Sequence, residues 1–337
     1  MNNALLGIKR QSEGRTITEA DIVQFAALTR DFSRLHTDAG YAARSVFGKR
    51  VGHGLLGLAV AEGLLARTRV LPGIVAAWEW TFSGAFFSGD TLWAEAEIVR
   101  RRPFLGSSLV IERVLVRNDK DVIQTGQHAI AVAPSSDHHL WLAAFAHTPV
   151  SEFDFKSVAE LDVVPQSTST ADARDETGVF YEDIHPGHRF TTPAMTLGDY
   201  DTSAFLGLVG DSEPWFQDHA LARRAALPEA PIPPLLGLTL VEGLKYALAP
   251  NRGVGIPMAS LSWRWRHERA ARRHATITVD VGIDGHRVST SKHDRGVVSQ
   301  FIRLREQDGP VFQCGQHFQL VRRRPVMPAA ERTSFGD

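Results

Sequence analysis

The chain has 337 residues, of which 43% are hydrophobic and 22% are charged, and its formal net charge is -1. This length allows two domains of ordinary size, and the balanced charge gives no reason to expect nucleic acid or an anionic membrane as a partner. Cys314 is the only cysteine, which excludes an intramolecular disulfide and a thiolate metal cluster. The polar N-terminus does not resemble a secretory signal, and no apolar run is long enough to cross a bilayer, so we expect a cytoplasmic protein.

The first predicted element is a helix that starts near residue 18. Thr18 is a suitable N-cap and Asp21 a suitable capping-box acid, and apolar residues then follow at helical spacing as far as Thr29. A polar segment interrupts this pattern. Within that segment, Asp38 is placed to be the N-cap of a short helix that runs through residue 42.

The polar segment also holds residues that suit chemistry. Asp31 and His36 are an acid and a base five positions apart, and Phe47-Gly48 leads into His53-Gly54, which opens a strongly apolar run. An acid, a base and a helix N-terminus are the parts needed to activate a water molecule and to hold a developing oxyanion. Alone, Asp31 would be read as a turn or cap residue and His36 as a structural histidine, but together at this spacing they favour a functional site.

A buried helix and a set of strands follow the polar segment. Residues 55–68 are apolar on nearly every face, which indicates a helix that is buried all round. Four runs rich in Val, Ile and aromatic residues then predict strands at 75–82, 91–99, 108–117 and 122–132, with a turn signal at 118–121. This order predicts an α+β fold in which an antiparallel sheet wraps round one long helix.

The sequence contains an internal repeat. A shift of 180 residues aligns Glu62-Gly63-Leu64 with Glu242-Gly243-Leu244, and a similar shift aligns Trp78 with Trp263. We therefore predict an N-terminal unit over residues 1–134, a linker over 135–176, a C-terminal unit over 177–325 and a tail over 326–337. The linker is rich in Pro, Ser, Thr and Asp, with a flexible segment at 166–176. Its histidines are expected to be solvated rather than metal ligands: His138, His139 and His147.

The second unit is predicted to repeat the strands of the first. The runs that indicate strands lie at 259–267, 276–283, 287–293, 297–304 and 311–321. The recurring tryptophans are read as packing residues of the sheet. Glu62 and Glu242 recur in both units, and because Glu242 persists where other polar residues change, a structural role is favoured for both.

The segment from Leu28 to Asp38, together with Phe47-Gly48 and His53-Gly54, resembles the signature of the MaoC-like, (R)-specific enoyl-CoA hydratase family. That signature is Gly-Asp-x-Asn-Pro-x-His-x-Asp, then Phe-Gly, then Ala-His-Gly at the head of a central helix. The resemblance implies the hot-dog fold, and the two units together imply a double hot-dog. Three positions depart from the signature, because Arg30 replaces Gly, Ser33 replaces Asn and Arg34 replaces Pro.

The resemblance implies an activity and a set of roles. The implied reaction is (R)-specific addition of water to a trans-2-enoyl thioester, or the reverse dehydration, with Asp31 and His36 as the catalytic pair. The N–H of Gly54 would stabilise the thioester oxyanion, and His53 would shape the loop. Further substrate-binding positions are implied as well: Ser33, Phe47, Gly48, His53, Arg30 and Arg34.

The second unit lacks several of these residues. Phe216 stands where the base is expected, and Pro233-Pro234 stand where His-Gly is expected. Proline has no N–H, so the C-terminal unit has lost both the base and a helix-initial donor. One functional site, in the N-terminal unit, is predicted, with the second unit as its partner wall.

The expected substrate is an acyl-CoA or acyl-carrier-protein thioester, with no cofactor and no metal, and we expect a homodimer of double hot-dogs. One interpretation of Arg30 and Arg34 is that an arginine meets an anionic group of the substrate, such as a second carboxylate or a CoA phosphate. The alternative is that both point to solvent or pair with Asp38 or Glu19. Two other functions fit the same residues, namely a hot-dog thioesterase or acyltransferase, and a non-catalytic acyl-thioester-binding subunit.

Overall fold

The computed structural model describes residues 5–153, 179–247, 257–289 and 292–324. The N-terminal half contains these elements: β1 (Lys9–Gln11), β2 (Arg15–Thr16), α1 (Glu19–Thr29), α2 (Arg34–Thr37), α3 (Ala39–Ala43), α4 (Gly54–Ala66), β3 (Gly73–Phe82), β4 (Thr91–Phe104), β5 (Ser107–Arg117), β6 (Val122–Val132) and α5 (His138–Phe145). The C-terminal half repeats this order: η1 (Tyr181–Asp183), β7 (Arg189–Thr191), β8 (Met195–Thr196), α6 (Asp199–Val209), η2 (Pro214–Phe216), α7 (His219–Arg224), α8 (Pro234–Ala247), β9 (Pro257–His267), β10 (Thr276–Val288), β11 (Arg295–Glu306) and β12 (Val311–Arg322).

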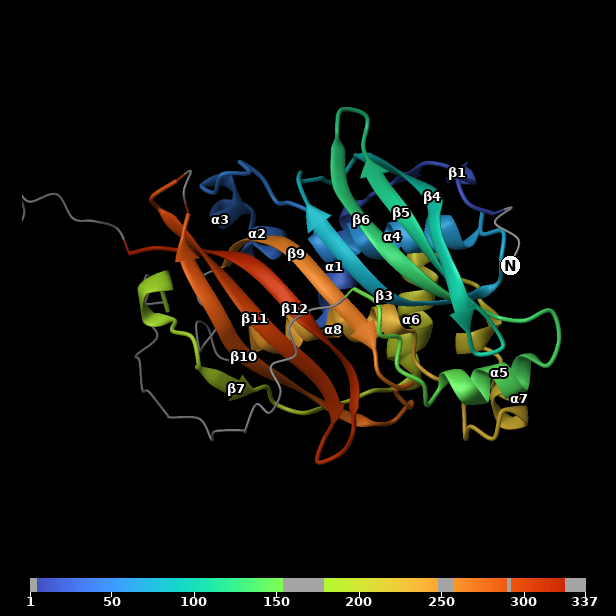
Figure 1. The fold of residues 1–337 in the computed structure, drawn as a ribbon. Coiled ribbons are helices and arrows are strands. Elements are labelled where there is room, and N and C mark those ends of the chain that lie inside the picture. Colours follow the sequence, from blue (N-terminus) through green and yellow to red (C-terminus); the bar gives the residue numbers. More distant parts are fainter. Residues whose placement is uncertain (1–4, 154–178, 248–256, 290–291, 325–337) are drawn as a thin grey trace, which may run out of the picture.

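The strands of both halves join in one antiparallel sheet. Its order is β1-β4-β5-β6-β3-β9-β12-β11-β10-β7, with β2 beside β4 and β8 beside β10. The halves meet where β3 pairs with β9, and there Trp78 lies opposite Trp265 and Trp80 opposite Trp263. The central helices α4 and α8 lie on one face of this sheet (Figure 1). The arrangement is a double hot-dog, as the sequence predicts.

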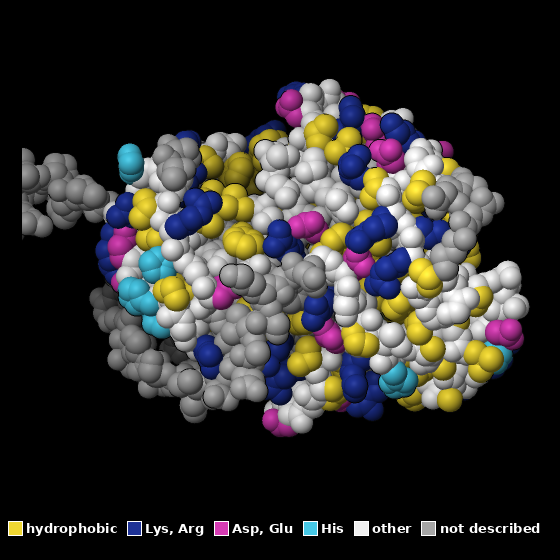
Figure 2. Space-filling model, viewed as in Figure 1, with side chains coloured by type: hydrophobic (Ala, Val, Ile, Leu, Met, Phe, Trp, Pro, Cys, Tyr) yellow, Lys and Arg dark blue, Asp and Glu magenta, His cyan; other side chains and the backbone are white. Residues whose placement is uncertain are grey.

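On the exposed face of the sheet, charges are neutralised locally. At the β3–β9 junction Arg264 Nε donates to a Glu79 carboxylate oxygen at 2.8 Å. Figure 2 shows basic, acidic and hydrophobic side chains interspersed over this face. Such exposed pairs contribute little to stability, about 0–1 kcal/mol each, so the fold is held mainly by its core.

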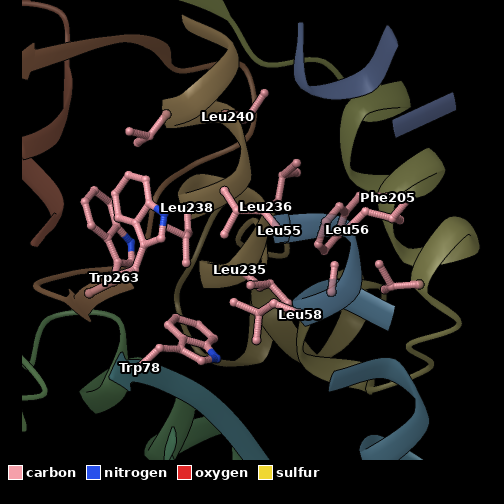
Figure 3. Close-up of a cluster of buried hydrophobic side chains, with 14 of the residues drawn as sticks. Leu55, Leu56, Leu58, Trp78, Phe205, Leu235, Leu236, Leu238, Leu240 and Trp263 are labelled. Carbon is pink, nitrogen blue, oxygen red and sulfur yellow. The ribbon is translucent and has the colours of Figure 1, made fainter. Parts of the chain in front are cut away.

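The core of the molecule is shared by the two halves. Every residue of α4 from Leu55 to Leu65 is buried, which confirms the prediction of a helix buried all round. A single hydrophobic cluster joins α4 and α8 to the central tryptophans (Figure 3). Each fully buried Leu side chain contributes roughly 1.5–3 kcal/mol to stability. Because the cluster contains residues of both halves, neither half has a complete core without the other.

Local capping signals fix where the helices begin. Thr18 and Asp21 form the predicted capping box of α1, and Asp38 caps α3 by accepting a hydrogen bond from the Tyr41 N–H at 2.8 Å. The repeat preserves the second device, since Asp218 accepts from the Leu221 N–H at 2.9 Å at the start of α7. These caps hold the polar segment between α1 and α4 in place.

Each central helix contacts the other half at a glycine. A Cβ atom at Gly243 in α8 would lie 1.7 Å from the carbonyl oxygen of Thr29, and one at Gly63 in α4 would lie 1.8 Å from that of Val209. Only glycine permits so close an approach of two backbones. The C-terminal part of α8 therefore lies against the chain just before Asp31, and the same part of α4 lies against the chain before Asp211.

Some predicted boundaries were wrong. The runs at 276–283 and 287–293 were predicted as separate strands, but β10 continues from Thr276 to Val288 through a bulge between Ile283 and Gly285. The predicted linker contains α5, which buries Trp141, Leu142 and Phe145. The segment 166–176 and the tail 326–337 lie outside the described residues. Among the described residues, no helix is long and apolar enough to cross a membrane.

Candidate active site

Asp31 lies at a sharp turn after α1. Arg30, the C-cap of this helix, has a left-handed backbone with φ 67°, and the chain then reverses so that Asp31 is buried. One carboxylate oxygen of Asp31 accepts a hydrogen bond from the Ser33 N–H at 3.1 Å. The counterpart of Arg30 in the second half is Gly210, with φ 76°. This position therefore requires a left-handed backbone, which the glycine of the family signature adopts freely. Arg30 adopts the same conformation at a cost in backbone strain.

His36 is held in one tautomer by the loop before α4. Its Nδ1 atom lies 2.7 Å from the carbonyl oxygen of Val51, and because a carbonyl only accepts, Nδ1 carries the proton. The Nε2 atom of His36 is consequently unprotonated in the neutral ring. This leaves a lone pair available to take a proton.

His53 supports both catalytic candidates. Its Nε2–H donates to the backbone carbonyl of Asp31 at 3.0 Å, and its ring stacks on that of His36 with centroids 3.7 Å apart. Burial, and then the nearby His36, lower the pKa of His53 to about 3. His53 is therefore neutral at neutral pH, and the loop-shaping role predicted for it stays a prediction.

The catalytic candidates converge on a small volume. A carboxylate oxygen of Asp31 and ring nitrogens of His36 and His53 all lie within 4.8 Å of one another. Gly54 follows as the first residue of α4, where a backbone N–H has no acceptor within the helix. The spacing of Asp31 and His36 allows a single water molecule to bridge them.

Among the described residues, two groups of side chains have the composition of metal ligands. The first is the Asp31, His36 and His53 set, but its two imidazole rings are stacked at an interplanar angle of 27°. Lone pairs in the planes of stacked rings run side by side rather than converging on one ion. The second group is Asp199, Glu229 and His274 at the exposed start of α6, which is an ordinary cluster of solvated charges.

The remaining predicted residues lie further out. Arg34 pairs with Asp38 at 3.0 Å, as the alternative interpretation proposed, and Arg30 is exposed with its guanidinium donating to the Ala27 carbonyl at 3.3 Å. Phe47 is half-buried, and Gly48 is exposed with φ 70° in the turn before α4. A substrate contact for any of these four residues stays a prediction.

The second half contributes residues that the sequence analysis missed. Lys245 of α8 is 2% exposed and donates to Glu242 at 2.7 Å and to His317 at 3.1 Å. Burial raises the pKa of Glu242, and the charge of Asp31 raises it further. Burial lowers the pKa of Lys245. A lysine within an apolar helical run was the available signal, but the sequence does not show that α8 reaches the other half's site.

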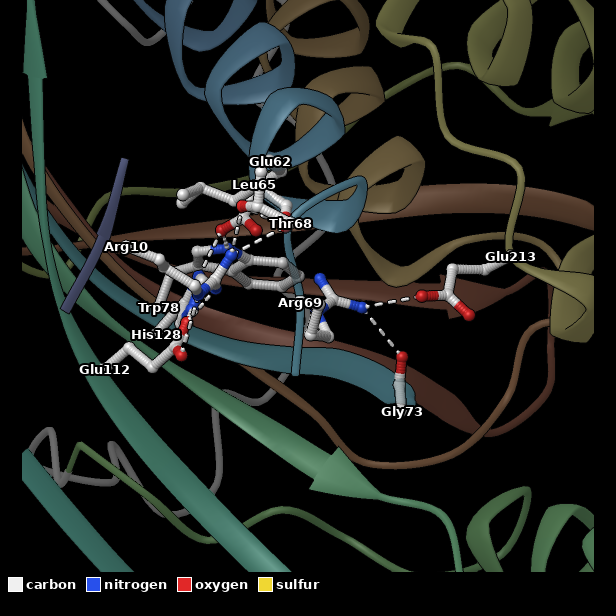
Figure 4. A network of polar contacts seen from close by, with 10 residues as sticks. All are labelled: Arg10, Glu62, Leu65, Thr68, Arg69, Gly73, Trp78, Glu112, His128 and Glu213. Carbon is white, nitrogen blue, oxygen red and sulfur yellow. Dashed lines mark hydrogen bonds and ion pairs between the residues drawn. The ribbon is translucent and has the colours of Figure 1, made fainter. Parts of the chain in front are cut away.

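The corresponding region of the second half carries different chemistry. Asp211 is present, and burial raises its pKa, but the buried Phe216 occupies the position of His36. Arg69 instead forms a pair with Glu213 at 3.2 Å. Figure 4 shows this pair beside a buried network around His128. The side chains here pair with each other, and the base of the first site has no counterpart.

The fold and the site define an α+β double hot-dog protein with an Asp and a His beside the start of a central helix. Residues 3–119 match the family model described as MaoC like domain. The chain is 36% identical over 86 residues to an (R)-specific enoyl-CoA hydratase from Aeromonas caviae, a match that covers 25% of this chain and 63% of the relative. Residues 3–119 are therefore similar to the MaoC-like family.

Solved structures support the same fold over nearly the whole chain. A putative MaoC domain protein dehydratase from Chloroflexus aurantiacus superposes with a TM-score of 0.76 at 16% identity, over 95% of this chain and 96% of that chain. A conserved hypothetical protein from Mycobacterium tuberculosis with a double hotdog fold superposes with a TM-score of 0.68 at 16% identity, over 94% and 96%. The chain spans less than two thirds of each curated relative it matches, namely 18%, 63% and 44% of their lengths.

Proposed function

We propose that this protein hydrates trans-2-enoyl thioesters with (R) specificity, or dehydrates the corresponding 3-hydroxyacyl thioesters. The observation that supports it best is the convergence of Asp31 and His36, whose oxygen and nitrogen atoms lie within 4.8 Å of each other at the head of α4. The similarity of the chain, over 86 residues, to an (R)-specific enoyl-CoA hydratase is consistent with the proposal.

In the proposed reaction, one water molecule binds between Asp31 and His36. The unprotonated Nε2 of His36 suits removal of a proton from that water, because Nδ1–H is engaged with Val51 at 2.7 Å. The hydroxide adds to the β-carbon, and the pair returns a proton to the α-carbon. The carboxylate of Asp31, held by the Ser33 N–H, stabilises the imidazolium that forms between these events.

The thioester oxygen gains negative charge as the enolate forms. The Gly54 N–H at the N-terminus of α4 is the donor proposed to meet it. A Cβ at Gly54 would lie 3.0 Å from the Phe82 ring, so glycine also leaves room for the thioester beside that ring. Loss of one oxyanion donor typically costs about 10²–10³ in turnover.

The test is the addition of water to crotonyl-CoA, followed as loss of enoyl-thioester absorbance by the full-length protein. Chiral analysis of the 3-hydroxybutyryl product would establish the (R) configuration. Release of free thiol without loss of the enoyl signal would instead indicate the alternative thioesterase. Binding with neither reaction would indicate a non-catalytic acyl-thioester subunit.

A further inference from the structure

The four central tryptophans differ in one respect that bears on the substrate. The indole N–H groups of Trp80 and Trp265 occupy equivalent positions in the repeat and donate to Gln124 at 2.9 Å and Gln313 at 3.0 Å. Trp78 donates to Glu62 at 2.8 Å. Its counterpart Trp263 is 1% exposed, yet its N–H makes no hydrogen bond within the described part of the chain.

A rearrangement around α8 explains why this donor is free. In the first half, Glu62 binds both Trp78 and His128, and a second carboxylate, Glu112, completes the network. In the second half, Glu242 is instead paired with Lys245. The position equivalent to Lys245 is the buried Leu65. The lysine therefore draws Glu242 away from the tryptophan and brings a buried positive charge.

The sheet side of this region is also more polar than its counterpart. Ser260 lies at the position of Val75, and its hydroxyl group is hydrogen-bonded to His317 at 2.9 Å. The amide of Gln300, which lies opposite His317 on the neighbouring strand, has no partner among the described residues. Unpaired buried polar groups cost about 1–3 kcal/mol each, so a ligand or water that satisfies them is favoured.

The repeat indicates that this polar region, formed by Lys245, Ser260, Trp263 and Gln300, faces the predicted catalytic site. Beside Asp211, a cavity between the two halves is lined by the first-half residues Glu62, Val75 and Trp78. By the repeat, the equivalents of these three residues on the side of Asp31 are Glu242, Ser260 and Trp263. The contact of Gly243 with the Thr29 carbonyl confirms that α8 lies directly against the Asp31 turn.

We propose that Trp263, Lys245 and Ser260 form a donor set that binds a hydrogen-bond acceptor on the acyl chain, so that the preferred substrate is a short acyl thioester carrying a hydroxyl or carboxylate group. The proposal rests on the acyl-thioester function above and names its substrate class. A plain alkyl chain would leave the Trp263 N–H unsatisfied, and sites built for hydrogen bonding reject analogues that lack the polar group. A carboxylate would gain most, because it could pair with Lys245, whose amino group already donates to Glu242 at 2.7 Å.

The test measures binding of saturated acyl-CoA thioesters by calorimetry, so that it does not depend on catalysis. At chain lengths of four and six carbons, thioesters ending in methyl, hydroxyl and carboxylate groups are compared. The full-length protein should bind at least one polar-ended thioester about tenfold more tightly than the methyl-ended one. The better of the two polar ends identifies the group.

Trp263→Phe removes the free N–H and keeps an aromatic ring. This variant should reduce the preference at least fivefold, because only the binding of the polar-ended thioester becomes weaker. Lys245→Met should also weaken binding of the polar-ended thioesters, and most strongly that of the carboxylate-ended one. Trp78→Phe is the matched control, since it makes the same change in the other half and should keep the preference.

Equal or tighter binding of the methyl-ended thioesters by the unmodified protein would overturn the proposal and assign the free donors to water. A polar preference without hydration of any enoyl-CoA would support this binding site while contradicting the hydratase function.

Discussion

The Nδ1 atom of His36 lies 2.7 Å from the carbonyl oxygen of Val51, in the loop that leads into α4. This contact sets the tautomer of the proposed base and ties it to the helix that supplies the proposed oxyanion donor. His36→Ala is expected to lower kcat by about 10² or more, the usual cost of losing a general acid or base. Circular dichroism should show an unchanged fold, and near-normal hydration by a folded variant would exclude His36 as the base.

Arg30 provides a test of the left-handed turn. Glycine adopts φ 67° without strain, and the repeat has Gly210 there, so Arg30→Gly is expected to raise the free energy of unfolding by about 1 kcal/mol. Urea denaturation measures this change. If Arg30 meets an anionic group of the substrate, the same variant should have a higher KM. Values of kcat and KM within about twofold of those of the unmodified protein would show that the side chain is a surface residue.

The two glycine contacts form a matched pair of sites. Gly243→Ala and Gly63→Ala each place a Cβ within 2 Å of a carbonyl oxygen, at 1.7 and 1.8 Å. Both should lower stability by about 1–3 kcal/mol through overpacking. Only Gly243→Ala moves the turn that carries Asp31, so it should reduce kcat/KM at least tenfold while Gly63→Ala leaves it within about threefold. Equal losses of activity in the two variants would argue against a single catalytic site at the Asp31 turn.

Local signals made much of this architecture predictable. Two features depend only on neighbours in sequence, namely the capping box of Thr18 and Asp21 and the apolar run of α4. The proximity of Asp31 to His36 depends on a short loop. The role of Lys245 was not predictable, because its partner His317 lies on β12 and the site beside it belongs to the other half. The continuation of β10 past Gly285 was missed because its pairing with β11 runs on through a bulge between Ile283 and Gly285, which depends on the neighbouring strand.

The buried network of the first half predicts a pH dependence of stability. His128 donates to Glu62 at 2.7 Å and to Glu112 at 2.8 Å, and Arg10 also pairs with Glu112 (Figure 4). Burial opposes the charged form, but the charge of Glu62 and these hydrogen bonds raise the pKa of His128 from 6.5 to about 8. A raised pKa stabilises the fold below the unfolded value and loses that effect as pH rises through the folded value.

Stability should therefore fall by roughly 2 kcal/mol between about pH 6.5 and pH 8.5, which corresponds to the change in the His128 pKa. Urea denaturation at intervals of half a pH unit measures this. His128→Gln should flatten the profile over that range. His317→Gln should retain it, because burial and Lys245 keep the pKa of His317 well below 6.5. A flat profile in the unmodified protein would mean that His128 is neutral in the folded state.

The central claim is that the repeat contains one catalytic site, built on Asp31, and a second region in which Asp211 no longer has a base beside it. The most direct measurement is the initial rate of crotonyl-CoA hydration by the unmodified protein, Asp31→Asn and Asp211→Asn. We predict hydration by the unmodified protein, a loss of about 10² or more in Asp31→Asn and a rate within about twofold of normal in Asp211→Asn. Equal losses in the two variants, or full activity in Asp31→Asn, would contradict this claim.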